Sequence, residues 1–329
     1  MFPNAYANGK RSIEGIPAIL AGLPALMHDP FISSAYSGNA VTSVAGLLGK
    51  ESYSTFFFHG GTNGTMGFDN FSKLAGFEKY FGRSEYNNDA DFDGSWGIYD
   101  EPFLVRAAQE LDKIKPPFLA SIFTLSSHHP YKIPEKYANQ FPKGTLPIHQ
   151  SVRYADYSLG KFFENASKMS WYENSLFIIT SDHTALSEHS FYRNHVGLFS
   201  VPLIMYIPGD TLMQGVNMKT TQQIDILPGL MDYLGYDKAF FAFGESMFET
   251  NSKGFAIQFI DDTYQLISDG YIFTLDTLRQ NTLYNFVLDS TLSSNISDVE
   301  SLQENKMALK LKSVVQQFNK AIIHNEMKP

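Results

Sequence analysis

Residues 175–195 read S-L-F-I-I-T-S-D-H-T-A-L-S-E-H-S-F-Y-R-N-H. The short apolar run 176–180 is rich in Ile and Phe, which is typical of a strand buried on both faces of a parallel sheet. Ser181, Asp182 and His183 follow at once, at the carboxyl end of that strand, where open α/β sheets collect ligands. A carboxylate beside an imidazole is a mixed ligand set suited to Zn or Mn. The alternative interpretation is a turn Asp next to a surface His.

Two further predicted strands also end on histidine. Residues 55–58 (T-F-F-F) precede His59-Gly60-Gly61, and the apolar residues 118–125 precede Ser126-Ser127-His128-His129-Pro130-Tyr131. One histidine at a strand end is usually structural, whereas three such ends on one sheet indicate a convergent site. The sequence therefore predicts an α/β fold with a polar site at the carboxyl edge of its sheet.

Ser12 heads another predicted helix, in which residues 12–17 lead into the apolar segment 18–27. A small polar residue in this position favours a helix N-cap. The functional alternative is a hydroxyl presented at a helix N-terminus, where backbone N–H groups and the helix dipole favour an anion such as phosphate. Asp100 has the same ambiguity before the predicted helix 103–114, and there a capping role is favoured over metal ligation.

Composition limits the classes of function. The chain has 329 residues, 43% of them hydrophobic, which suffices for a large α/β domain. The net charge of -9 without long runs of either sign argues against a nucleic-acid partner. The absence of cysteine excludes thiol catalysis, disulfides and Cys-ligated zinc, and fits an extracytoplasmic bacterial protein. We expect no membrane span and no signal peptide within these residues.

The character of the chain changes near residue 244. Before it, apolar strands alternate with amphipathic segments, including the predicted helix 222–234. After it, residues 255–259, 264–268 and 271–275 are predicted short strands separated by Asp261-Asp262 and Asp269-Gly270, and residues 302–324 a closing helix. We therefore expect a core at 1–243, with antiparallel strands and a helix at 244–329 as part of the same domain.

Taken together, these motifs resemble the sulfatase-like branch of the alkaline phosphatase superfamily. They are a strand then Ser-Asp-His, a strand then Ser-His-His-Pro-Tyr, a strand then His-Gly-Gly, and Gln-Gln-Ile-Asp-Ile-Leu-Pro near the end. Within that branch the chain is similar to lipoteichoic acid synthases and related phosphoglycerol transferases, and more distantly to phosphoethanolamine transferases. The resemblance implies a mostly parallel sheet between helices, with a small C-terminal antiparallel subdomain.

The resemblance also implies roles for individual residues. Ser12 takes the place of the family's threonine nucleophile, which also contacts the metal. Asp182 and His183 match the metal pair. His128, His195 and His59 match the family's histidines that contact substrate, and His128 and His195 are also candidate proton donors. One divalent metal is implied, with Mn favoured and Zn or Mg as alternatives.

Two departures from the family are visible. The Trp and Arg that hold glycerophosphate in lipoteichoic acid synthases are replaced by Met66 and Phe68. The family's remaining metal ligand, a Glu ending a strand upstream of the nucleophile, has no counterpart here, because Glu14 and Glu51 are badly placed. We therefore expect a further Glu, and a membrane region, upstream of residue 1.

These implications lead to three functional hypotheses. The first is a metal-dependent transferase that moves a phosphoglycerol-type headgroup from a lipid donor to an extracytoplasmic acceptor through a covalent Ser12 intermediate. The second is a metal-dependent phosphodiesterase or sulfuric ester hydrolase that uses water as acceptor. The third is a non-catalytic glycan- or lipid-binding relative. The expected partner is an anionic phosphoester, and the expected location is the cell envelope of a bacterium, on a membrane-anchored protein.

Overall fold

The computed structural model describes residues 1–211, 214–276, 278 and 280–328. The chain divides into two compact units. The first unit comprises Met1–Val44, Phe177–Met205 and Gln214–Pro329, and the second comprises Ala45–Leu176 and Tyr206–Met213. The boundary predicted after residue 243 stays a prediction.

In the first unit, helix α1 (Ser12–Ala21) and strand β5 (Phe177–Thr180) share one apolar core. Strand β1 (Ala5–Tyr6) pairs in parallel with β7 (Thr221–Gln222), and β5 is bonded to β6 (Leu203–Tyr206). Helix α7 (Ile226–Tyr233) follows β7. The cluster that joins these elements contains Phe2, Ala5, Leu203, Ile226 and Met247, with Ile19, Ile178, Met205 and Phe248 packed against it.

Helix α1 begins at Ser12, the residue predicted to head it, but it ends at Ala21 instead of continuing to residue 27. Gly22 terminates it in the left-handed conformation at φ 58°, and its N–H donates to the carbonyl of Ala18 at 3.1 Å. A glycine adopts this conformation without steric cost, and Pro24 prevents the helix from resuming.

Strand β5 matches its predicted position but not its predicted burial. All four of its residues are half-buried, where the apolar run predicted a strand covered on both faces. Among the described residues, its ladder contains only two strands, β5 and β6. A strand in such a small ladder presents more of its surface than one inside a wide sheet. The Ser-Asp-His exit lies directly after Thr180, as predicted.

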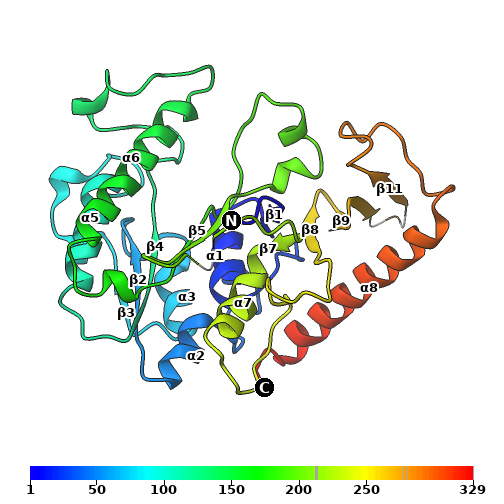
Figure 1. The fold of residues 1–329 in the computed structure, drawn as a ribbon, viewed down its shortest axis with the longest axis horizontal. Helices are drawn as coiled ribbons and strands as arrows, with labels where there is room; N and C mark the ends of the chain where they lie inside the picture. The colour runs from blue at the N-terminus through cyan, green and yellow to red at the C-terminus, as the bar shows by residue number, and fades with distance from the viewer. Residues whose placement is uncertain (212–213, 277, 279, 329) are drawn as a thin grey trace. The chain divides into compact units, whose positions relative to one another are not determined.

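The C-terminal part of the first unit is an antiparallel sheet, as predicted. Its order is β11 (Asn281–Asn285), β10 (Tyr271–Asp276), β9 (Thr263–Ser268) and β8 (Ala256–Ile260). Both predicted turns have positive φ at their two central positions, at Asp261-Asp262 and Asp269-Gly270. This is the geometry of tight hairpins whose twist matches the strands. Helix α8 (Ser301–His324) packs on β9 and β10 (Figure 1).

The second unit is built on a parallel three-stranded sheet. Strand β2 (Ser54–His59) is central, between β3 (Lys79–Phe81) and β4 (Phe118–Phe123). Phe56, Phe57 and Phe58 of β2 are all at most 5% exposed, which fits a strand with neighbours on both sides. Together with the antiparallel sheet, these parallel ladders confirm the predicted α/β class.

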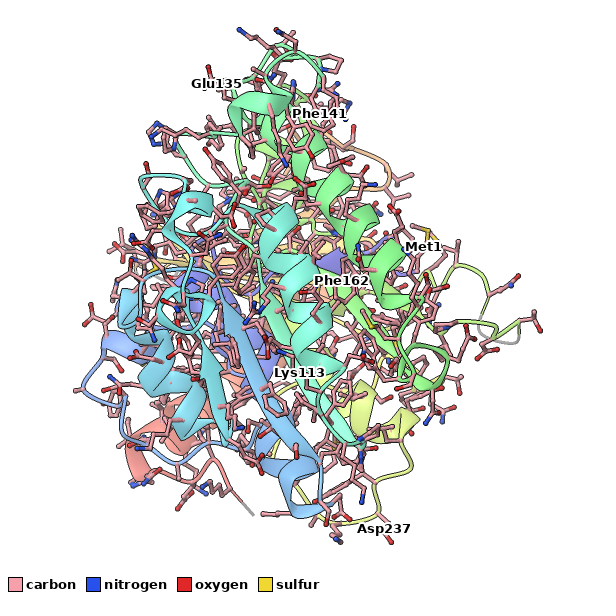
Figure 2. The ribbon with its side chains drawn as sticks, turned by 90° about the vertical axis from the view of Figure 1, so that its left-hand side faces the viewer. Met1, Lys113, Glu135, Phe141, Phe162 and Asp237 are labelled. Atoms are coloured by element: carbon pink, nitrogen blue, oxygen red, sulfur yellow. The ribbon has the colours of Figure 1, made fainter. Side chains whose placement is uncertain are left out.

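Helices complete the second unit. Helices α5 (Asp100–Leu111) and α6 (Ile148–Ala166) lie side by side, with Lys113 just past the end of α5 and Phe162 on α6 (Figure 2). The shorter helices are α2 (Val44–Lys50), α3 (Phe68–Leu74) and α4 (Arg83–Tyr86). Within the described part of the chain, no helix has the length and apolarity needed to cross a bilayer.

Candidate functional site

The polar exit of β5 orients two side chains toward each other. The backbone N–H of His183 donates to Asp182 Oδ1 at 2.9 Å, and His183 Nε2 lies 3.5 Å from Asp182 Oδ2. His183 Nδ1 is 2.8 Å from the carbonyl oxygen of Thr184. Since a carbonyl only accepts, Nδ1 carries the proton and Nε2 of the neutral ring has a free lone pair. This is the tautomer that a metal-binding histidine needs.

Ser12 lies beside this pair. Its Oγ is 3.5 Å from His183 Nε2, and the residue is 8% exposed. Arg11 is the N-cap residue and Ser12 the first helical residue, so the expected capping role of Ser12 is not observed. The structure thus brings together Ser12, Asp182 and His183, the three side chains predicted to surround a metal.

Close packing fixes α1 against the exit of β5. A Cβ on Gly15 would lie 2.3 Å from the backbone oxygen of Asp182, far inside van der Waals contact. Only a glycine permits this approach. The position three residues after Ser12 therefore sets the distance between the hydroxyl and the Asp-His pair.

The spacing of these atoms fits ligands of one metal ion. Two ligands bound at about 2.0–2.1 Å in tetrahedral geometry are roughly 3.4 Å apart. The separations observed are 3.5 Å from Ser12 Oγ to His183 Nε2 and 3.5 Å from His183 Nε2 to Asp182 Oδ2. Across the described residues, no three His, Cys, Asp or Glu side chains gather as a metal cluster. The candidate ligands are thus one carboxylate, one imidazole and one hydroxyl, which is fewer than the four of a tetrahedral site.

The contacts that the charged neighbours of Ser12 make were not predicted from the sequence. Glu14 Oε2 accepts from the backbone N–H groups of Lys10 (2.8 Å) and Arg11 (3.1 Å), which shapes the turn into α1. Lys10 Nζ donates to Thr184 Oγ1 at 2.5 Å, next to His183, and burial lowers the pKa of Lys10. The only signal in the sequence is the position of Lys10, two residues before the hydroxyl.

His128 lies in the second unit, beyond the end of β4. Its Nδ1 is 2.9 Å from the carbonyl oxygen of His129, which leaves Nε2 as the free edge. The Trp96 ring lies against the imidazole with centroids 3.9 Å apart, and Trp96 Nε1 donates to the same carbonyl at 2.6 Å. The side chain is therefore oriented on two sides, although its predicted contact with substrate stays a prediction.

Asp100 does not act as the predicted N-cap. Tyr99 is the N-cap residue of α5 and Asp100 its first residue. Asp100 Oδ1 accepts from the N–H groups of Leu125 (2.9 Å) and Ser126 (3.0 Å). Burial raises the pKa of this carboxyl group. The side chain thus fixes the loop that leads to His128.

His59 is more buried than we expect of a residue that binds substrate. It is 1% exposed, its Nδ1 lies 2.7 Å from the Tyr80 hydroxyl, and a Cβ on Gly61 would lie 2.8 Å from its Nε2. Burial lowers the pKa of His59 to about 4, so the ring is neutral at ordinary pH. This environment favours a packing role, and the predicted binding role stays a prediction.

The remaining predicted positions are more open. His195 is exposed, and its carbonyl accepts from Gln265 Nε2 at 2.9 Å. Met66 is 39% exposed, whereas Phe68 is 1% exposed and packs edge-on against His59. Position 68 is therefore part of the core of the second unit, and the expected loss of the arginine contact stays a prediction.

Several known proteins are similar to this chain in sequence. The Sulfatase family model matches residues 1–236. Lipoteichoic acid synthase 1 of Bacillus subtilis (strain 168) is 27% identical over 278 residues, 78% of this chain and 42% of that protein. Lipoteichoic acid synthase of Staphylococcus aureus (strain USA300) is 26% identical over 66% of this chain and 36% of that protein. The chain thus spans roughly two fifths of these relatives.

Solved structures agree on the fold. A protein in the alkaline phosphatase superfamily from Vibrio parahaemolyticus has a TM-score of 0.85 at 25% identity, covering 100% of this chain and 79% of that one. The lipoteichoic acid synthase LtaP from Listeria monocytogenes has a TM-score of 0.80 at 18% identity, covering 97% and 82%. With the match over residues 1–236, these findings show that the chain belongs to the sulfatase family and has the alkaline phosphatase superfamily fold.

Proposed function

We propose that this protein is a metal-dependent transferase that moves a phosphoglycerol-type headgroup from a lipid donor to an extracytoplasmic acceptor through Ser12. The observation that carries the proposal is the position of His183 Nε2, which lies 3.5 Å from Ser12 Oγ and 3.5 Å from Asp182 Oδ2. The similarity to lipoteichoic acid synthases supports the choice of substrate class.

Asp182, His183 and Ser12 would hold one divalent ion. A bound divalent ion lowers the pKa of a neighbouring hydroxyl and neutralises charge on phosphoryl oxygens. The carboxylate and hydroxyl oxygens favour Mn over Zn, although the imidazole suits both, and Mg is a further alternative. A further oxygen ligand is expected to complete the set.

The chain's own residues supply the remaining steps. Ser12 Oγ would give its proton to water and attack phosphorus, and the bond from phosphorus to the lipid alkoxide would break. His195, which lies in the same unit as Ser12, would donate the proton that the departing alkoxide takes up. The acceptor hydroxyl then attacks the same phosphorus, which breaks the bond to Ser12 Oγ and restores the serine. The N-terminal position of Ser12 on α1 favours the anionic group through the helix dipole.

A hydrolase is the second candidate, because the matching family model is Sulfatase. The same side chains would serve, with water in place of the acceptor hydroxyl. Either enzyme would act in the cell envelope on an anionic ester, and the non-catalytic relative would bind such a ligand without turnover.

The test uses the full-length protein in vesicles that contain a lipid with a phosphoglycerol headgroup, with Mn²⁺ added or chelated. We expect Mn²⁺-dependent release of diacylglycerol, lost in Ser12→Ala. Glycerol added in excess distinguishes the two enzymes, since a transferase gives glycerophosphoryl products on the added acceptor and a hydrolase gives free glycerophosphate. Turnover that persists in Ser12→Ala would overturn the proposed route.

A further inference from the structure

One buried side chain connects the three segments of the first unit that form this site. Gln223 is 2% exposed and begins a 3-10 turn directly after β7. Its Nε2 donates to the carbonyl oxygens of Ser181 (2.8 Å) and Asp182 (2.7 Å). Its Oε1 accepts from the backbone N–H of Asn8 at 2.9 Å, four residues before Ser12. Both amide hydrogens and the amide oxygen of Gln223 are therefore engaged.

Asn8, which donates its backbone N–H to Gln223, is itself fixed by further hydrogen bonds. Asn8 is fully buried, its Oδ1 accepts from Ile224 N at 3.1 Å, and its Nδ2 donates to Gln222 Oε1 (2.8 Å) and to the carbonyl of Ile257 (2.9 Å). Every partner lies in a strand or turn of the same unit. The segment that leads to Ser12 is thus tied to the turn that carries Gln223.

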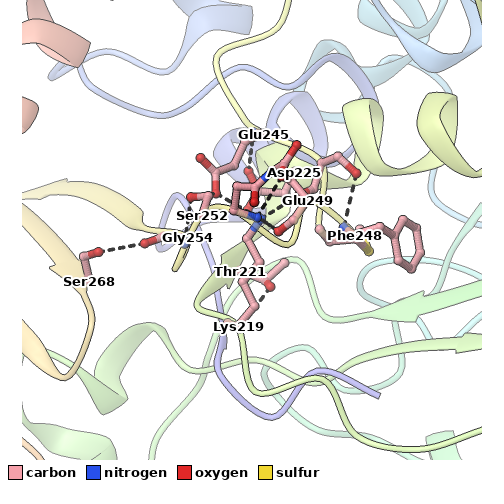
Figure 3. A network of polar contacts seen from close by, with 12 residues as sticks. Lys219, Thr221, Asp225, Glu245, Phe248, Glu249, Ser252, Gly254 and Ser268 are labelled. Carbon is pink, nitrogen blue, oxygen red and sulfur yellow. Dashed lines mark hydrogen bonds and ion pairs between the residues drawn. The ribbon is translucent and has the colours of Figure 1, made fainter.

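The Asp225 carboxylate stabilises the turn that contains Gln223. Asp225 Oδ2 accepts from the backbone N–H of Gln222 at 3.0 Å, and Oδ1 accepts from that of Glu245 at 3.0 Å. Figure 3 shows the surrounding network, in which the Lys219 ammonium is 3.0 Å from Glu245 Oε1. Gln223 therefore projects from a backbone that is itself hydrogen-bonded on both sides.

The Asp182 carbonyl is confined from two directions. Gln223 Nε2 donates to it, and the backbone of α1 at Gly15 packs against it. Since the Asp182 side chain and the next residue, His183, extend from this peptide, a shift of the carbonyl would move both away from Ser12 Oγ.

We propose that Gln223 is a positioning residue that holds the Asp182-His183 pair in register with Ser12. This inference rests on the proposed function. Groups that orient metal-binding side chains typically change metal affinity or activity by about 10–100-fold when removed. Loss of Gln223 is therefore expected to weaken Mn²⁺ binding and lower kcat, with little effect on KM.

The test compares Gln223→Met and Gln223→Glu with Gln258→Met in the full-length protein. Methionine preserves length without either amide donor, and glutamate preserves shape while replacing the donor nitrogen with an acceptor. Gln258 is a matched control, because it is also fully buried and donates to the carbonyl of Ala7 at 3.2 Å, but makes no bond to Ser181 or Asp182.

Three measurements are made on each folded variant: Mn²⁺ affinity by calorimetry with Mn²⁺ alone, the urea midpoint, and kcat and KM. We expect about 10–100-fold weaker Mn²⁺ binding and a matching loss of kcat for the Gln223 variants, and wild-type affinity for Gln258→Met at a comparable urea midpoint. The inference would be overturned if the Gln223 variants and Gln258→Met had the same Mn²⁺ affinity and the same kcat. Wild-type protein that neither binds Mn²⁺ nor turns over would instead overturn the proposed function.

Discussion

Replacing Gly15 with alanine tests how closely helix α1 must approach the exit of β5. The added Cβ would lie 2.3 Å from the Asp182 oxygen, 2.9 Å from its carbonyl carbon and 3.1 Å from its Cα. All three atoms are backbone, so no side-chain rotation can relieve the overlap. Since carbon atoms prefer separations of about 3.5–4.0 Å, α1 and the Asp182 peptide must move apart by about 1 Å.

The energetic effects on folding largely oppose each other. Alanine in a helix is favoured over glycine by about 1 kcal/mol, and the overlap costs about 1–3 kcal/mol. The net loss of stability is therefore about 0–2 kcal/mol. A misplacement of about 1 Å at a catalytic group lowers turnover by about 100-fold, or about 2.7 kcal/mol in the activation free energy. The loss in activation free energy should therefore exceed the loss in stability.

The assay measures diacylglycerol release and the urea midpoint for Gly15→Ala and for Gly160→Ala. Gly160 lies inside α6, where an added Cβ has nothing within 4 Å. Gly160→Ala should raise stability by about 0.5–1 kcal/mol and leave turnover unchanged. Wild-type turnover in Gly15→Ala would refute the view that this packing sets the position of Ser12.

Three other predictions concern stability. Burial raises the pKa of Asp225 to about 8. The contribution of Asp225 to the unfolding free energy therefore falls as pH rises from about 4 to about 8. A series of urea titrations at different pH values should show this dependence in wild type and not in Asp225→Asn. Burial lowers the pKa of His59 to about 4. The contribution of His59 to the unfolding free energy therefore falls as pH drops from about 6.5 to about 4. His59→Leu should remove that decline in stability, and an unchanged decline in the variant would contradict the prediction. Phe57 is 0% exposed, and Phe57→Ala should cost about 3–5 kcal/mol in chemical denaturation; a loss below about 1 kcal/mol would show that the core of the second unit is not close-packed there.

The sequence predicted best what depends on local pattern. The apolar run before Asp182 indicated a strand that ends at Thr180, and the observed β5 ends there. The paired turn residues Asp269-Gly270 indicated a hairpin, because both positions require positive φ. In each case the signal lies within a few residues of the feature.

The sequence predicted poorly what depends on distant contacts. Gly22 and Pro24 ended α1 earlier than the apolar run suggested, although both are known stop signals. Gln223 could not be identified as a partner of Asp182, since 41 residues separate them and an amide has no local pattern that marks its target. The Asp100 carboxylate likewise bonds to amides 25 and 26 residues away, not to its own helix.

The most direct test of the central claim is to search for the covalent intermediate on Ser12. The full-length protein would be mixed with Mn²⁺ and the phosphoglycerol lipid without acceptor, quenched in acid and analysed by peptide mass spectrometry. We expect the peptide that contains Ser12 to gain a glycerophosphoryl group, and the corresponding peptide of Ser12→Ala to remain unmodified. Turnover of the lipid with no modification of Ser12 at any time point, and equal turnover by Ser12→Ala, would contradict the account.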